Sequence, residues 1–210
     1  MKRVAAAIVI ALLLAAWCSA ADKPAAKEGW ISLFDGKTLN GWKVGQNADS
    51  FKVQDGLIVA NGPVAHLFYL GEVQKHDFKN FHLKADVMTF PKANSGIYFH
   101  TKYQEAGWPK QGYEVQVNQT HSDPKKSSGL YGVKDVFEAP AKDNVWYTQE
   151  IIVQGKRIIT KVDGKVLVDY TEPDDVQGDR RLSRGTFALQ AHDPGSKVYF
   201  KNIMVKPLPD

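Results

Sequence analysis

Residues 146–170 read WYTQEIIVQGKRIITKVDGKVLVDY, and their pattern decides the fold class. β-Branched and aromatic residues alternate with polar ones in three runs, Trp146–Gln154, Arg157–Val162 and Val166–Tyr170. The last two runs are joined by Asp163-Gly164, a pair favoured in tight hairpins because both turn residues need a positive φ. The stretch therefore predicts three consecutive antiparallel strands.

The same pattern extends over most of the chain, where short alternating runs are separated by Gly, Pro, Asn and Asp. Two further turns fit it, Asp55-Gly56 and Gln154-Gly155-Lys156. Helical periodicity is nearly absent, so we predict an all-β sandwich or barrel. The other predicted strands are Phe51–Gln54, Leu57–Ala60, Phe81–Phe90, Gly96–Lys102, Gly112–Asn118, Gly185–Gln190 and Val198–Val205.

The chain is long enough for one domain and carries little excess charge. It has 210 residues, 43% of them hydrophobic, with 27 Lys and Arg against 23 Asp and Glu. Lys2 and Arg3 supply half of the formal charge of +4, and no basic block is present. These values argue against a disordered chain and against a nucleic-acid partner. We expect a single domain over residues 29–208.

The N-terminus has the features of a cleaved secretory signal. Basic Lys2 and Arg3 precede an uncharged run, Val4–Trp17, and small residues before Ala21. The run is shorter than the roughly 20 apolar residues of a membrane span. We predict a signal peptide over residues 1–20, a polar tether over 21–28, and a periplasmic or secreted protein. Cleavage there removes Cys18, the only cysteine. The alternatives are an uncleaved anchor and a lipoprotein acylated at Cys18.

Three of the predicted strands carry, on one face, polar residues of the types found in catalytic and sugar-binding sites. Residues two apart in a strand share a face, which groups Tyr98 with His100, Glu114 with Gln116 and Asn118, and Gln190 with His192. A solvated sheet face would also give alternation. However, these side chains supply the stacking surfaces and paired donors that sugar rings need. We expect them to form one concave site, with Trp108 and Asp193 contributing from adjacent loops.

The common signatures of metal, nucleotide and nucleophile chemistry are missing. The chain contains no HExxH, CxxC, P-loop or GxSxG motif, and we predict no cofactor. The six histidines show no metal-ligand spacing. A metal site assembled in space, for example from His100, Glu114 and His192, remains open at this point.

Several spaced segments resemble one known family. GWISLFDGKTLNGWKV from Gly29 resembles the opening of the 3-keto-disaccharide hydrolase domain family. Further matches follow in the family's order: NSGIYFH from Asn94, GYEVQV from Gly112, SGLYGV from Ser128, the segment from Trp146 to EIIVQGKRI, LQAHD from Leu189 and VYFKNIMVKPL from Val198. The resemblance implies a concanavalin A-like jelly roll of two antiparallel sheets, in an exported bacterial protein acting on glycosides oxidised at C3. The chain has Ala191-His192-Asp193 where the family often has Asp-His-Gly.

A 3-keto group makes the C2 proton acidic, so a base can start elimination at C1, and water addition completes hydrolysis. His192 and Glu114 suit base and acid in either order, and His100, Tyr98 or Gln116 could polarise the carbonyl. Ordinary glycosidases instead use two carboxylates, and Gln116 stands where a second acid would lie. Together with the resemblance, this chemistry predicts an exported enzyme that cleaves 3-keto-glycosides or 3-keto-disaccharides. The alternatives are a non-catalytic carbohydrate-binding module and an interaction domain.

Overall fold

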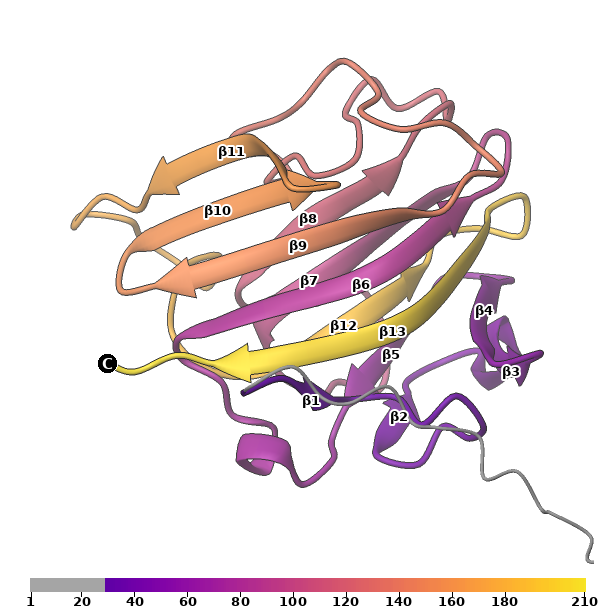
Figure 1. The fold of residues 1–210 in the computed structure, drawn as a ribbon, viewed down its shortest axis with the longest axis horizontal. Coiled ribbons are helices and arrows are strands. Elements are labelled where there is room, and N and C mark those ends of the chain that lie inside the picture. Colours follow the sequence, from indigo (N-terminus) through magenta and orange to yellow (C-terminus); the bar gives the residue numbers. More distant parts are fainter. Residues whose placement is uncertain (1–28) are drawn as a thin grey trace, which may run out of the picture.

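The computed structural model describes residues 29–210, which form two antiparallel β-sheets packed face to face (Figure 1). Within these residues, helix is limited to two short 3₁₀ turns, η1 (Ala48–Ser50) and η2 (Val73–His76). The prediction of an all-β sandwich is confirmed. The predicted signal peptide and tether lie outside the described residues. No helix in residues 29–210 has the length and apolar character needed to cross a membrane.

The larger sheet, sheet A, has the strand order β11-β10-β9-β6-β13-β4-β3, and β1 also pairs with β13. Its strands are β1 (Ile31–Ser32), β3 (Phe51–Gln54), β4 (Leu57–Asn61), β6 (Phe81–Thr89), β9 (Tyr147–Gln154), β10 (Arg157–Val162), β11 (Lys165–Thr171) and β13 (Lys197–Pro207). Sheet B has the order β2-β5-β12-β7-β8. Its strands are β2 (Trp42–Val44), β5 (Ala65–Tyr69), β7 (Asn94–Thr101), β8 (Tyr113–Asn118) and β12 (Thr186–Ala191).

The predicted hairpin turns are confirmed. Gln54 pairs with Leu57 across Asp55-Gly56, and Val162 pairs with Lys165 across Asp163-Gly164. All four turn residues have positive φ, as a type I′ turn requires. Gln154 likewise pairs with Arg157 across Gly155 and Lys156.

The sequence missed β1, β2 and β5, for two different reasons. β1 and β2 have two and three residues, too few to show a period. β5 is buried at every position, so it lacks the apolar–polar alternation that marks a half-exposed strand.

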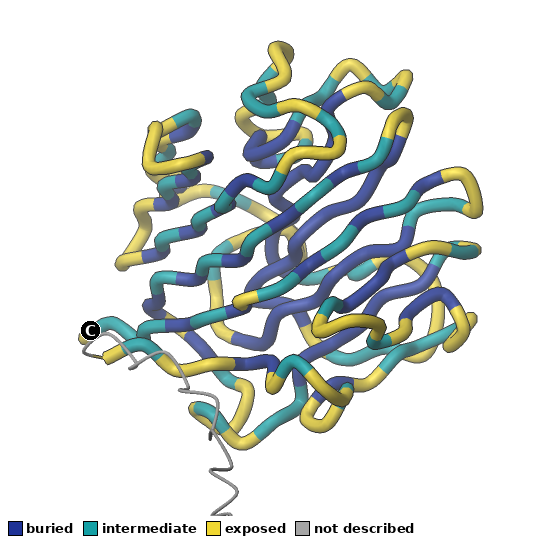
Figure 2. Tube along the Cα trace, turned by 45° about the vertical axis from the view of Figure 1, so that its right-hand side comes forward, coloured by how far each residue is buried: buried dark blue, intermediate teal, exposed yellow. Residues whose placement is uncertain are grey.

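The core lies between the sheets, and the outer face of sheet B is also covered. Ile97, Val115 and Leu189 point into the core, as their alternation predicts. Every residue of β7, β8 and β12 is buried, including the polar ones on the outer face (Figure 2). Loops cover this face, so its polar side chains line a pocket.

Candidate active site

The three strands that carry the predicted polar residues are neighbours in sheet B, in the order β12-β7-β8. Tyr98 pairs with Glu114 across β7 and β8, and with Ala188 across β7 and β12. The outer side chains of the three strands therefore meet in one pocket of about 270 Å³. It is lined by Asn94, Tyr98, Trp108, Pro109, Gly112, Glu114, Gln116, Asp123, Tyr131, Arg180, Gln190 and His192.

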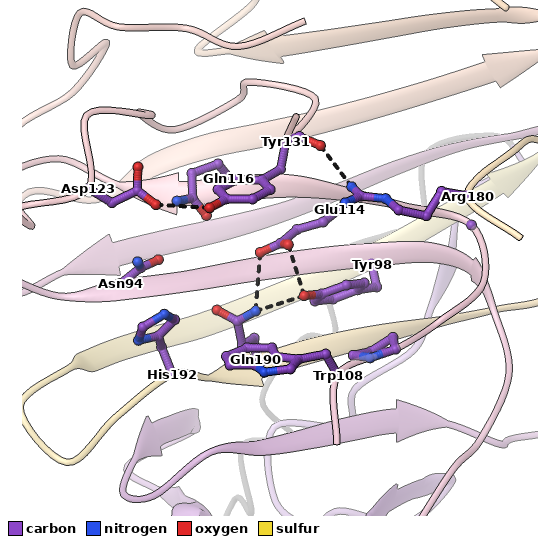
Figure 3. Close-up of a pocket in the computed structure, with 12 residues that line it drawn as sticks. Asn94, Tyr98, Trp108, Glu114, Gln116, Asp123, Tyr131, Arg180, Gln190 and His192 are labelled. Atoms are coloured by element: carbon purple, nitrogen blue, oxygen red, sulfur yellow. Dashed lines mark hydrogen bonds between the residues drawn. The ribbon is translucent and has the colours of Figure 1, made fainter. Parts of the chain in front are cut away.

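Tyr98, Glu114 and Gln190 form a closed hydrogen-bonded triangle at the base of this pocket (Figure 3). The Tyr98 hydroxyl donates to Glu114 Oε2 at 2.8 Å. Gln190 Nε2 donates to the Tyr98 oxygen at 2.9 Å and to Glu114 Oε1 at 3.1 Å. The triangle fixes both carboxyl oxygens of Glu114 in a single orientation.

The environment of Glu114 favours its protonated form. Burial raises the pKa of Glu114, while the hydrogen bonds from Tyr98 and Gln190 and the charges of Arg180 and His192 oppose the rise. Burial and the adjacent Glu114 charge also raise the pKa of Tyr98, which therefore remains a neutral donor. A raised pKa in a cleft is a common property of catalytic acids and bases.

Gly96 provides the space that the Glu114 side chain occupies. The two residues lie on the paired strands β7 and β8, where Gly96 pairs with Gln116. A Cβ atom at Gly96 would overlap Glu114 Oε1 and would come within 2.9 Å of Glu114 Cγ. The glycine in the NSGIYFH segment thus sets the position of the carboxyl group.

We expect Gly96→Ala to displace the Glu114 carboxyl group and to lower turnover by at least about tenfold, because small misplacements of a reacting group are costly. The overpacking should cost about 1–3 kcal/mol of stability. Steady-state kinetics and thermal melts on the same preparation check this. Wild-type turnover in Gly96→Ala would show that the Glu114 position is not critical.

His192 and Asp193 form a second pair at the rim of the pocket. His192 Nδ1 donates to Asp193 Oδ2 at 2.8 Å, so Nε2 carries the lone pair when the ring is neutral. Asp193 also accepts from the Gly195 backbone N–H and the Ser196 hydroxyl. Burial alone would raise the pKa of Asp193, but these hydrogen bonds lower it. Asp193 therefore both stabilises the turn after β12 and orients His192.

Trp108, which the sequence predicts to contribute from a loop, lies beside His192 in the pocket lining. It is 47% exposed, and its ring lies 5.5 Å from that of His192 and 5.4 Å from that of His66. His66 is on β5, one of the three strands that the sequence did not predict. Burial, with the His192 charge, lowers the pKa of His66 to about 4, so this ring is neutral at neutral pH.

The prediction that His100 belongs to the site is wrong. His100 has a φ of 54°, which breaks the strand alternation at this residue. Its Nε2–H donates to the Lys79 carbonyl at 2.9 Å, and its Nδ1 accepts from the Ser183 N–H at 3.1 Å. Burial lowers its pKa to about 4. His100 is thus a neutral structural residue, and the metal set of His100, Glu114 and His192 does not form.

Two glycines make this departure at His100 possible. A Cβ at Gly112 or at Gly185 would lie 2.8 or 2.9 Å from the His100 carbonyl carbon. The backbone can therefore turn out of the strand path only because both neighbours lack a side chain.

Asn118 also plays a structural part, contrary to prediction. Its Nδ2 donates to the carbonyls of Asp123 and Lys125, and its Oδ1 accepts from the His121 N–H. It shapes the loop after β8 and does not line the pocket. Gln116 does line it, and its Oε1 has no hydrogen-bond partner among residues 29–210.

The sequence did not predict Asn94, at the start of β7, or three residues that loops bring to the pocket: Asp123, Tyr131 and Arg180. Arg180 Nη2 donates to the Tyr131 carbonyl at 2.7 Å, and the Tyr131 hydroxyl donates to Asp123 at 3.1 Å (Figure 3). The spacing of residues along a sequence predicts the faces of a strand, but it does not predict where a loop side chain lies over a sheet. Only Asn94 and Tyr131 had a signal, because they lie in the NSGIYFH and SGLYGV segments.

One group of residues has the composition of a metal site. Ligand atoms of His121, His192 and Asp193 lie within 4.8 Å of one another. However, His121 Nδ1 accepts from the Asp123 N–H at 3.0 Å, and His192 Nδ1 donates to Asp193. The observed hydrogen bonds already use one nitrogen of each ring and the Asp193 carboxylate.

Comparison with solved structures supports the fold. A candidate glycosyl hydrolase from Parabacteroides distasonis superposes with a TM-score of 0.73 at 24% identity, covering 87% of this chain and 95% of that one. A Bacillus subtilis protein of unknown function with a galectin-like fold superposes with a TM-score of 0.58 at 10% identity, covering 80% and 90%. The two sheets therefore form a sandwich of the galectin and concanavalin type.

Comparison of sequences identifies the family. The chain is 25% identical to a 3-keto-disaccharide hydrolase of Bacteroides thetaiotaomicron over 93% of this chain and 84% of the relative. Residues 29–206 match the model of the 3-keto-alpha-glucoside-1,2-lyase-like domain. The chain therefore belongs to this family of carbohydrate-acting proteins.

Proposed function

We propose that the protein cleaves 3-keto-glycosides or 3-keto-disaccharides, by elimination followed by addition of water. One observation carries the proposal: the pocket combines a buried carboxyl of raised pKa, Glu114, with a histidine, His192, whose Nδ1–H is held by Asp193 so that Nε2 is the basic nitrogen of the neutral ring. The pair supplies an acid and a base without a covalent nucleophile. Family membership supports the 3-keto substrate class.

In the first step, His192 Nε2 removes the proton from C2 of the sugar. The electrons of the C2–H bond form a C2=C3 double bond, and the negative charge moves to the C3 oxygen. The guanidinium of Arg180 lines the same pocket and stabilises this enolate, in the role expected of His100, which lies elsewhere. The single hydroxyl hydrogen of Tyr98 stays in its hydrogen bond to Glu114.

In the second step, the C3 carbonyl re-forms, the C1=C2 double bond forms and the C1–O bond breaks. Protonated Glu114 gives its proton to the leaving oxygen. Water then adds across C1=C2, with hydroxide at C1 and the proton at C2. The sum is hydrolysis of the glycosidic bond, with no change in oxidation state.

The polar groups of the pocket also suit a sugar ring. Three buried amide oxygens, on Asn94, Gln116 and Gln190, have no partner within residues 29–210 and can accept from hydroxyl groups. The pocket contains a second carboxylate, Asp123, which the strand pattern did not reveal. Its oxygens accept from the Lys125 N–H and the Tyr131 hydroxyl, which favours a structural part over that of a second glycosidase acid.

The test compares a 3-keto-disaccharide with the same unoxidised disaccharide, with and without a chelator. We expect turnover of the keto substrate alone, unaffected by the chelator, and incorporation of deuterium at C2 in heavy water. Cleavage of the unoxidised sugar at an equal rate would point to an ordinary glycosidase. Sugar binding without turnover would support the carbohydrate-binding alternative.

We further propose that the protein is exported and that the mature chain begins near Ala21. The proposal rests on the basic, apolar and small-residue order of residues 1–20. N-terminal sequencing of secreted or periplasmic material tests it. A lipid-modified Cys18 at the first position would establish the lipoprotein alternative.

A further inference from the structure

A second hollow, of about 720 Å³, lies at the other end of the same strands. Its floor includes Thr101 at the end of β7 and Thr186 at the start of β12. The Gly112 N–H donates to the Asp179 carbonyl at 3.1 Å, which joins the two loops that separate this hollow from the first pocket. Arg180 lines the first pocket and Arg181 lines the second.

The charges around this hollow are unbalanced. Lys75, Lys102 and Arg181 line it, and none of them has a carboxylate within 4.0 Å among residues 29–210. Arg184, by contrast, pairs with Asp77 at 2.8 Å. Asp179 is the other acidic residue in the lining. The unpaired side chains thus carry a positive surplus, which attracts an anion.

The floor also contains an unused hydroxyl. Thr101 is 1% exposed, and its Oγ1 has no hydrogen-bond partner in the described part of the chain. Its neighbour across the sheet, Thr186, donates its hydroxyl to the Tyr69 carbonyl. A buried hydroxyl without a partner costs free energy, so Thr101 is a donor available to an occupant of the hollow.

The segment that carries Lys75 into the lining is strained. Gln74, Lys75 and His76 have φ values of 51°, 52° and 48°, three consecutive non-glycine residues in the left-handed region. Such residues are energetically costly and cluster at ligand sites. This backbone conformation places Lys75 and His76 beside the hollow, where both contribute to its lining.

We propose that this second hollow binds an oxyanion-bearing ligand, with Lys75, Lys102 and Arg181 supplying the charge and Thr101 a buried hydrogen bond. The ligand chemistry is a carboxylate or sulfate group, either free or carried on an acidic sugar. The proposal does not depend on the reaction assigned to the first pocket.

Binding is measured by proton–nitrogen correlation spectra of the labelled protein, titrated separately with glucuronate, glucose and inorganic sulfate. We expect saturable shifts of the Thr101, Lys102 and Arg181 amides with the anions, weaker at higher salt, and none with glucose. Tighter binding of glucuronate than of sulfate assigns the site to an acidic sugar. Equal affinities assign it to the bare anion.

The double variant Lys102→Gln/Arg181→Gln should bind about tenfold more weakly, since both charges are exposed and individually modest. Thr101→Val keeps shape and charge and should weaken binding about threefold, through loss of one hydrogen bond. Lys52→Gln, an exposed lysine on β3, is the matched control and should bind as wild type. Equal binding by the double variant, or no response to either anion, would overturn the proposal.

Discussion

Glu114→Gln is expected to lower turnover of a 3-keto-glycoside by about 10²–10⁴-fold, the usual contribution of a general acid. Glutamine keeps the size of the side chain and can still accept from Gln190, but its amide is not an acid and gives no proton to the leaving group. Its amide nitrogen can donate to the Tyr98 oxygen in place of the bond that the carboxyl group accepts. The pocket should therefore stay intact while the chemistry is lost.

The pH dependence gives this prediction a second readout. Burial raises the pKa of Glu114, so the wild-type enzyme should lose activity as pH rises through that raised value. The residual activity of Glu114→Gln should lack this alkaline limb.

Glu114→Gln should raise the stability of the protein at neutral pH while it lowers the activity. The folded state of the wild type binds a proton at Glu114 more tightly than the unfolded chain does. Its stability therefore falls as pH rises from the unfolded to the folded pKa. Glu114→Gln removes this dependence, so we expect a higher melting temperature at neutral pH. A variant that retains both activity and the alkaline limb would exclude Glu114 as the acid.

His192→Ala should also cost about 10²–10⁴-fold in turnover, by removal of the base. Asp193→Asn should cost less, because His192 remains but loses the carboxylate that orients its ring. Turnover rates and deuterium exchange at C2, measured on both variants, test whether His192→Ala has the larger effect. Exchange at the wild-type rate in His192→Ala would exclude His192 as the group that removes the C2 proton.

Val115→Ala is the structural control for both active-site variants. Val115 is fully buried in the core, on the face of β8 opposite Glu114. Its truncation should destabilise the protein by about 1 kcal/mol or more and leave turnover per folded molecule unchanged. Equal losses of stability in the His192 and Val115 variants would indicate that His192→Ala acts through folding.

The sequence was sufficient for side chains in the middle of the regular strands, but not for Asn118 at the end of β8. Tyr98, Glu114 and Gln190 meet because strand periodicity puts them on one face, and the structure makes their strands neighbours. The same rule failed at His100. This residue has a left-handed backbone conformation, packed against Gly112 and Gly185, which takes its side chain out of the strand alternation. It was silent on Arg180 and Asp123, because their positions depend on how loops fold over the sheet.

The loop that carries Arg180 is fastened to the sheet at a distance from the reacting groups. The Tyr113 hydroxyl donates to Glu172 at 2.5 Å, and the Leu182 N–H donates to the same carboxylate at 2.7 Å. By contrast, the proposed acid Glu114 lies on β8, and the proposed base His192 directly follows β12. Of the groups assigned to the reaction, only Arg180 comes from this loop. A different stretch between Glu172 and Leu182 would therefore change one wall of the pocket and the Arg180 charge while it leaves Glu114 and His192 in place.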